Sequence, residues 1–136
     1  MLIAKRVNAM ALILALLMLS ANIAQASAIV LVDGAKAELQ SAVFTRLKAE
    51  AAAAQLKKTG KTAPLNTQYQ EALEQALSEW RSALPDAVAR VAIASKADVA
   101  IEPSTAKLKG LQGTDVTAQV VKALDAQFAN LKFVSP

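Results

Sequence analysis

The sequence predicts a mostly helical α+β protein, with a small β body and a long antiparallel helical hairpin. Three observations lead to this class. Alanine dominates the composition and only 4% of the residues are aromatic, which is typical of helix-rich proteins with close helix contacts. Two stretches with helical spacing, 35–58 and 67–96, lie in the middle of the chain with a short break between them. Short apolar runs typical of strands lie before and after these stretches.

The first of these apolar runs is 28–33, which is β-branched and ends at Asp33-Gly34. We expect a buried strand there. The stretch from Ala35 to about Lys58 contains no Gly or Pro and is rich in Ala, Glu, Lys and Leu, so we expect one amphipathic helix. Its second half offers only alanines as apolar residues, which favours a close helix neighbour. The apolar face of its first half repeats every four residues: Leu39, Val43 and Leu47, with Phe44 beside them.

A break is predicted at 59–64, because Gly60 lies where a helix C-cap is expected and Pro64 blocks continuation. A second helix then opens at Asn66 or Thr67, and Thr67–Gln70 has the spacing of a capping box. Two helices joined by a short break should form an antiparallel hairpin, which would reach on the order of 35 Å. The second helix carries an apolar stripe with helical spacing: Tyr69, Leu73, Leu77, Trp80 and Leu84.

Pro85 interrupts this second helix, and its missing N–H and its ring should kink it. We favour a kinked continuation to about Lys96. The alternative is that the helix ends at Leu84-Pro85 and that residues 90–95 form a strand.

Residues 98–103 alternate like a second strand, with Val99 and Ile101 on one face. Residues 106–109 are a candidate edge strand whose lysines would discourage pairing with another edge. After a loop marked by Gly110 and Gly113, a final helix is expected over 116–129 with Thr114 or Asp115 as its cap, and 131–134 is a candidate closing strand. The stripe of the final helix is Val116, Val120, Leu124 and Phe128.

The N-terminal 28 residues have the pattern of a secretory signal peptide. Lys5 and Arg6 precede an apolar run, and overlapping Ala-x-Ala sequences end at Ala26 and at Ala28. Both are possible cleavage positions, and we favour cleavage after Ala28. The alternative is an uncleaved anchor, because no charge occurs between Arg6 and Asp33. In either case the sequence predicts export to the periplasm, with 29–136 as a single domain.

Composition excludes several classes of function. The chain has no histidine and no cysteine, so we expect no metal site, no cofactor and no enzymatic activity. Without disulfides, long helices and oligomerisation are the available sources of stability. Beyond residue 28 the net charge is 13 − 11 = +2, which is too weak to suggest nucleic acid but suits a mildly acidic partner or an anionic lipid surface.

Two short motifs match families of enzymes. Ser104–Lys107 has the form S-x-x-K and Lys58–Gly60 the form K-T-G, which together are found in penicillin-binding proteins and β-lactamases. Their order here is reversed, and the domain is far smaller. The stretch Gly60–Thr62 looks like the end of a P-loop, but no glycine stands five residues earlier. We interpret these matches as accidental.

The two ends of the exported part resemble the Skp/OmpH family of periplasmic chaperones. Four segments carry the likeness: an apolar strand that ends in Asp33, the strand at 98–102, the helix that starts Asp115-Val-Thr and runs to Phe128, and the final residues 131–136. The hairpin matches only in type and is shorter than usual in that family. The resemblance implies a homotrimer, in which a β body (29–34 and 98–136) carries projecting hairpins (35–97) of coiled-coil type. It also implies that the protein holds unfolded outer-membrane proteins without ATP.

Two sets of residues are expected to carry this function. In the assembly body we expect apolar contacts between chains through Ile29, Val30, Leu31, Val32, Val99, Ile101, Val116, Val120 and Leu124. On the hairpin we expect client binding through Leu56, Lys57, Lys58, Lys61, Leu65 and Tyr69, with three lysines gathered at the tip. The simpler interpretation of the lysines is a solvated turn.

A second family offers a different class of function. The stretch 69–80 and Asp115-Val-Thr also resemble TrbI-like accessory proteins of conjugation systems. In that interpretation residues 7–28 stay in the membrane, and the protein serves a secretion or conjugation apparatus. Cleavage of the N-terminus distinguishes the two alternatives.

Overall fold

A computed structural model describes residues 28–136 of the chain. Helices dominate and the strands are short, which confirms the predicted mostly helical α+β class. The expected signal peptide or anchor at 1–27 lies outside the described residues. In chain order the elements are β1 (Ile29–Leu31), α2 (Gly34–Gln40), α3 (Ala42–Thr59), α4 (Thr67–Ala94), β2 (Val99–Ile101), α5 (Pro103–Leu108), β3 (Thr114–Asp115) and α6 (Thr117–Gln127).

The three strands form one parallel sheet in the order β2-β1-β3. Leu31 in the central strand pairs with Ile101 on one side and with Asp115 on the other. Parallel neighbours require crossover connections, which α2–α4 and α5 supply. The strands predicted at 28–33 and 98–103 are therefore confirmed, and they lie side by side.

The other strand predictions are wrong. Residues 106–109 fall mainly in α5, because Pro103 stands at the first helical position, where its fixed φ favours a helix. Residues 131–134 have no regular secondary structure. The short strand β3 forms at Thr114–Asp115, where only a helix cap was expected. The final helix is confirmed, but its N-cap is Val116 and not Thr114 or Asp115. The carboxylate of Asp115 accepts a hydrogen bond of 2.8 Å from the backbone N–H of Thr117.

The helix predicted over 35–58 is in fact two helices, because the chain turns at Ser41. Ser41 has an extended backbone and caps α3 by accepting a hydrogen bond from the N–H of Phe44. Its hydroxyl donates to Asp125 in α6, whose carboxylate also accepts from the N–H of Ala42. The turn leaves Leu39, which was expected on the buried face, 82% exposed.

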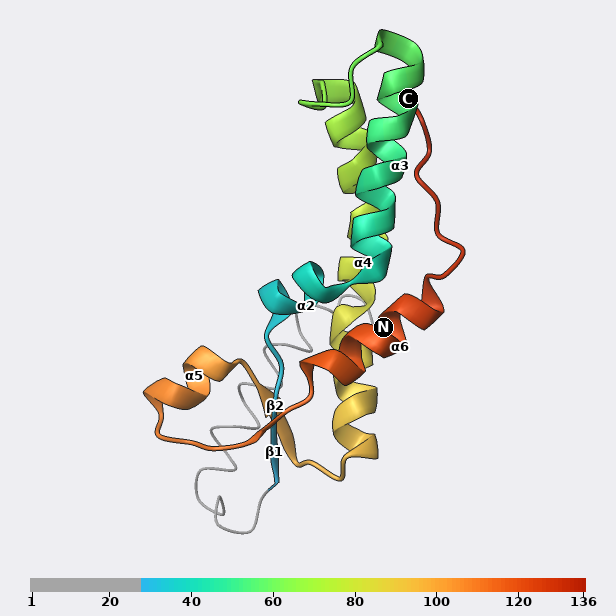
Figure 1. Ribbon diagram of the computed structural model, residues 1–136. Coiled ribbons are helices and arrows are strands. Elements are labelled where there is room, and N and C mark those ends of the chain that lie inside the picture. Colours follow the sequence, from blue (N-terminus) through green and yellow to red (C-terminus); the bar gives the residue numbers. More distant parts are fainter. Residues whose placement is uncertain (1–27) are drawn as a thin grey trace.

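The second helix continues through Pro85 to Ala94, as expected. The alternative strand at 90–95 is wrong, since this stretch is the end of α4 and the turn that follows it. Asn66 is the N-cap of α4, because its side chain accepts from the N–H of Tyr69. Figure 1 shows α3 beside the upper part of α4 and α6 across its lower part. None of the helices within 28–136 is long and apolar enough to cross a bilayer.

The main core lies where α3, α4 and α6 meet the sheet. Its centre is Trp80, which is fully buried and packs edge-on against Phe44 with ring centroids 4.8 Å apart. The indole N–H donates to Asp125 at 3.0 Å, so the polar end of Trp80 has a partner inside the core. On the opposite face of the sheet, β2 packs against Ala106 of α5 in a smaller cluster.

Candidate functional site

The residues expected in an assembly body lie around the sheet and α6. Within a single chain, Ile29 and Leu31 are partly buried and the other seven are buried. They are divided between the main core, with residues such as Val30 and Leu124, and the cluster beneath α5, with Val99 and Ile101. These side chains therefore stabilise the fold of one chain, and their burial does not by itself call for a second copy.

The three lysines of the expected client-binding set lie together at the far end of the α3–α4 pair. Lys57 and Lys58 occupy the last turn of α3, and Lys61 follows the left-handed C-cap Gly60, which has φ 77°. All three lysines are exposed. No acidic residue occurs between Glu50 and Glu71, so this end, which we call the basic tip, is purely cationic in sequence. Cations are also favourable at a helix C-terminus.

A buried glutamine holds the loop of the basic tip in place. Gln55 is 2% exposed, and its amide nitrogen donates to the carbonyls of Lys61 and Pro64 at 3.1 and 3.0 Å. Its amide oxygen accepts from the N–H of Asn66 at 2.7 Å. The Gln55 side chain thus supplies hydrogen-bond partners for three backbone groups of the loop. Sequence reasoning missed it, although its spacing of four from Ala51 continues the buried face of α3.

The apolar residues of the expected client-binding set differ in exposure. Leu56 is 47% exposed and Leu65 is half-buried against the core. Tyr69 is only 4% exposed, because Phe133 of the C-terminal segment stacks over it with ring centroids 6.3 Å apart and planes 15° apart. Tyr69 is therefore accessible only where the C-terminal segment moves away.

One face of the α3–α4 pair carries a groove of about 660 Å³, which we call the α2 groove because α2 borders it. Leu39 stands at its edge, almost fully exposed. The groove is apolar at its floor and charged at its rim. It is lined by Ala35, Glu38, Leu39, Phe44, Lys48, Leu65, Gln70, Leu73, Glu74, Leu77 and Arg81.

Arg81 forms the charged rim of the α2 groove. Its guanidinium makes two hydrogen bonds to Glu38, at 2.9 and 3.0 Å, and one to Glu74, at 2.8 Å. It also lies 5.4 Å from the centre of the Phe44 ring. This arrangement links α4 to α2 at the edge of the groove. Phe44, Leu73 and Leu77 lie beneath it and are buried, so its most accessible apolar side chain is Leu39.

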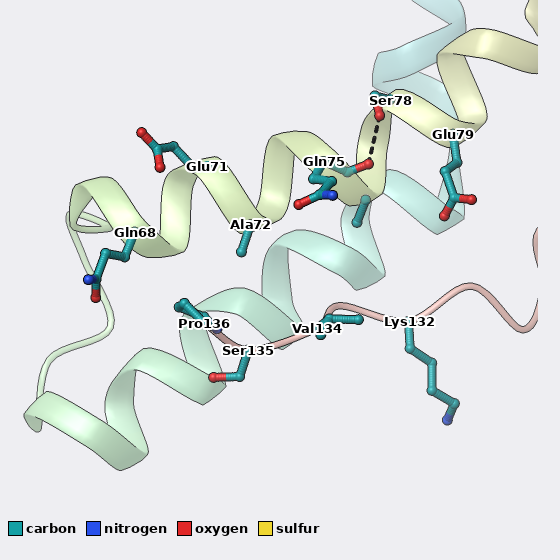
Figure 2. Close-up of a pocket in the computed structure, with 11 residues that line it drawn as sticks. Gln68, Glu71, Ala72, Gln75, Ser78, Glu79, Lys132, Val134, Ser135 and Pro136 are labelled. Carbon is teal, nitrogen blue, oxygen red and sulfur yellow. Dashed lines mark hydrogen bonds between the residues drawn. The ribbon is translucent and has the colours of Figure 1, made fainter.

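The C-terminal segment, residues 128–136, covers the opposite face of the α3–α4 pair (Figures 1 and 2). Cavities of about 760 and 530 Å³ lie on either side of it. The larger is bordered by α4 and includes Glu71 and Glu79, whereas the smaller is bordered by α3 and includes Lys57 and Lys58. The two faces of the helical pair thus differ: one is an open apolar groove and the other is partly filled.

A pair of carboxyl groups lies at the junction of the strands and helices. Burial, together with the nearby charge of Asp33, raises the pKa of Glu102 above its ordinary value. Asp33 is already engaged as the N-cap of α2, where it accepts from the N–H of Lys36. The pair therefore belongs to the start of α2, where the N–H of Asp33 also donates to the hydroxyl of Thr117 at 3.0 Å.

The sequence motifs of serine acylases are not assembled. Ser104–Lys107 lies in α5, and Lys58–Gly60 lies at the end of α3. Figure 1 shows these two places at opposite ends of the molecule. Within residues 28–136, no group of three acidic, His or Cys side chains is arranged to hold a metal ion.

No family model, no curated protein and no solved structure matches the chain. The resemblances to Skp/OmpH and to TrbI-like proteins therefore rest on the quoted residues alone.

Proposed function

We propose that the protein is an ATP-independent holdase of the periplasm, which binds unfolded outer-membrane proteins and keeps them from aggregating. The observation that carries this proposal is the open apolar α2 groove on a helical pair whose far end is cationic. An apolar groove binds exposed apolar side chains without regard to sequence, and the lysines attract acidic stretches from about 10 Å away. Neither contact needs a catalytic group, which agrees with the absence of His and Cys.

The proposed architecture is an antiparallel hairpin formed by α3 and α4 on a body that assembles as a homotrimer. Two observations support assembly. The sheet has only three short strands, and within 28–136 neither β2 nor β3 has a strand on its outer side. The mass of the exported protein in light scattering should then be three times that of the chain; the mass of one chain would remove the trimer from the proposal.

The proposed location follows from the signal-peptide pattern of the first 28 residues. Mass spectrometry of the protein recovered from a periplasmic extract should give a chain that begins near Ile29. A full-length chain recovered from the membrane fraction would contradict this part of the proposal.

The α2 groove is tested by Leu39→Glu, with Leu108→Glu as the matched control. Both leucines are exposed, at 82% and 88%, but only Leu39 borders the groove. Light scattering of an unfolded outer-membrane barrel diluted from urea measures the suppression of aggregation. Leu39→Glu should require about fivefold more protein for the same suppression, since about 1 kcal/mol of apolar contact is lost. Equal behaviour of the two variants would exclude the groove.

The basic tip is tested by replacing Lys57, Lys58 and Lys61 with Glu together. We expect weaker client binding at low salt and a difference that disappears at about 1 M salt, where charges are screened within about 3 Å. Client affinity that is unchanged at low salt would assign the three lysines to solvated surface.

One observation favours a second candidate function. The uncharged stretch 7–32 is long enough to span a bilayer, as in a membrane-anchored accessory protein of a secretion or conjugation apparatus. In that case the α2 groove would bind a folded component of the apparatus. Recovery of the full-length chain in the membrane fraction, together with no suppression of aggregation, would favour this candidate over the holdase.

A further inference from the structure

After α6 the chain runs back along α3 and α4. Figure 2 shows residues 132–136 between the two helices. The N–H of Phe133 donates to the carboxylate of Glu50 at 3.0 Å, and its ring stacks on Tyr69. Farther back, the guanidinium of Arg46 donates to the carbonyls of Phe128 and Ala129, both at 3.4 Å. We call the surface of α3 and α4 beneath this segment the cradle.

The cradle holds its occupant by few contacts. Of residues 129–136, only Leu131 and Phe133 are partly buried; Val134 is 76% exposed. The segment is extended, and the backbone N–H of Leu131 donates to the carbonyl of Phe128 at 3.0 Å. Arg46 and the core contact of Leu131 hold the start of the segment, whereas the ring and N–H of Phe133 anchor its end. Residues 132–136 can therefore leave by breaking the contacts of Phe133, without unfolding the core.

The cradle is also wider than its occupant. Open depressions of about 760 and 530 Å³ flank the segment, one on its α4 side and one on its α3 side. Small side chains line them: Ala53 and Ala54 on α3, and Ala72 and Ala76 on α4. This space, bordered by small side chains, would accept an extended chain whose side chains are larger than those that now occupy it, Lys132, Val134 and Ser135.

We infer that the cradle is a binding site for an extended polypeptide segment with an aromatic residue, and that the protein's own C-terminal segment occupies it in the absence of such a segment. The aromatic residue would stack on Tyr69, and the main-chain N–H of that residue would donate to Glu50, as Phe133 does now. The inference rests on the proposed function for the source of the segment, an unfolded client. It adds a second binding face, opposite the α2 groove, and explains how the buried Tyr69 can contact a client.

Competition with the attached segment determines the affinity that an experiment will find. A tethered segment acts at an effective concentration in the millimolar range, so a short free peptide displaces it poorly. A long unfolded client offers many extended aromatic segments at once and suffers less from this competition. Weakening the attached segment should therefore reveal binding of a short peptide.

The test uses the exported chain with Phe133→Ala, and with Val134→Ala as the matched control. Both positions lie in the same segment, but Phe133 stacks on Tyr69, whereas the side chain of Val134 is 76% exposed. The probe is a fluorescent peptide with the sequence of residues 130–136, and its binding is measured by anisotropy. A second probe carries Ala in place of its Phe. We expect Phe133→Ala to bind the first probe about tenfold more tightly than the wild type or Val134→Ala does, and the second probe to lose this gain.

Other outcomes separate this inference from the proposed function. Two outcomes would overturn the cradle as a site for an aromatic segment. In one, all three proteins bind the first probe with equal affinity; in the other, Phe133→Ala binds the two probes with equal affinity. The same would follow if an unfolded barrel failed to displace the probe from Phe133→Ala. The aggregation assay with Leu39→Glu reports on the holdase independently, because Leu39 lies on the other face of the helical pair.

Discussion

The two ends of α4 are stabilised in different ways. Near the body, large side chains such as Trp80 and Leu124 are completely buried, and Asp125 joins three elements through its carboxylate. At the far end the face of α3 is alanine, and a polar side chain, Gln55, holds the loop. Apolar burial therefore stabilises the body end, while the far end keeps open space and exposed charge. Binding surfaces are commonly found in the parts of a structure that have few buried apolar contacts.

The largest expected effect is at the body end, with Trp80→Ala. This change removes a fully buried ring, its contact with Phe44 and its hydrogen bond to Asp125, so we expect a loss of about 3–5 kcal/mol in the free energy of unfolding. Urea denaturation followed by circular dichroism measures it. Ile93→Ala, on the same helix but 75% exposed, should change the free energy by less than about 0.5 kcal/mol. Similar losses in the two variants would contradict the contrast.

Asp125→Ala should be the next largest change. It leaves the hydroxyl of Ser41 and the indole N–H of Trp80 without their acceptor, and each buried donor left unpaired costs about 1–3 kcal/mol. We expect a loss of roughly 2–4 kcal/mol by urea denaturation, with the exposed Lys122→Ala as the control. A double-mutant cycle with Ser41→Ala should show that the two changes are not additive.

At the far end, Gln55→Ala should have a smaller and more local effect. Three backbone groups of the loop lose their partner, and we expect a loss of about 1–3 kcal/mol. Hydrogen exchange should become faster at residues 61–66 while the amides around Trp80 keep their protection. Gln75→Ala, at an exposed position of α4, is the control. Faster exchange throughout the protein would mean that the two ends are not independent.

The parts of the fold that could be predicted from the sequence are those with a local signal. Three such features are confirmed: the strands around Val30 and Ala100, the end of α3 at Gly60, and the apolar stripe of α4. Each depends on sequence periodicity or on the backbone preference of a residue. The break at Ser41 could not be predicted, because it depends on Asp125, which lies 84 residues away. The same applies to β3, where only two residues pair and the partner strand determines the pairing.

The candidate site could be predicted only in part, for the same reason. The exposure of the basic tip follows from local charge, and the sequence indicated it. The burial of Tyr69 depends on a segment that was expected to be a strand of the body, since Phe133 meets Tyr69 only after α6 has turned the chain back. The edge of the α2 groove could not be predicted either. The spacing places Leu39 on a buried helix face, whereas the turn at Ser41 leaves it exposed beside the groove. Long-range contacts therefore make both faces of the helical pair.

The smallest predicted effect is a pH dependence with opposite signs at the two ends. At the far end, the hydrogen bond from the N–H of Phe133, with Arg46 beside it, lowers the pKa of Glu50 below its ordinary value of 4.5. The contribution of Glu50 to docking of the C-terminal segment is thus complete above pH 4.5 and is lost as the pH falls through the lowered pKa. At the body end, burial raises the pKa of Glu102, so stability declines as the pH rises from 4.5 through the raised value.

Side-chain carbon NMR of the two carboxyl groups over a pH titration measures both shifts in one sample. Glu50 should titrate below pH 4.5 and Glu102 above it. The amide shift of Phe133 should follow the titration of Glu50 and become flat in Glu50→Gln, because the carboxylate of Glu50 accepts the hydrogen bond from this N–H. Glu102→Gln should remove the decline in stability and leave Phe133 unchanged. Titration of both groups at the same pH would show that neither the docked segment nor the buried junction persists in solution. The contrast between the two ends of the molecule would then lose its electrostatic basis.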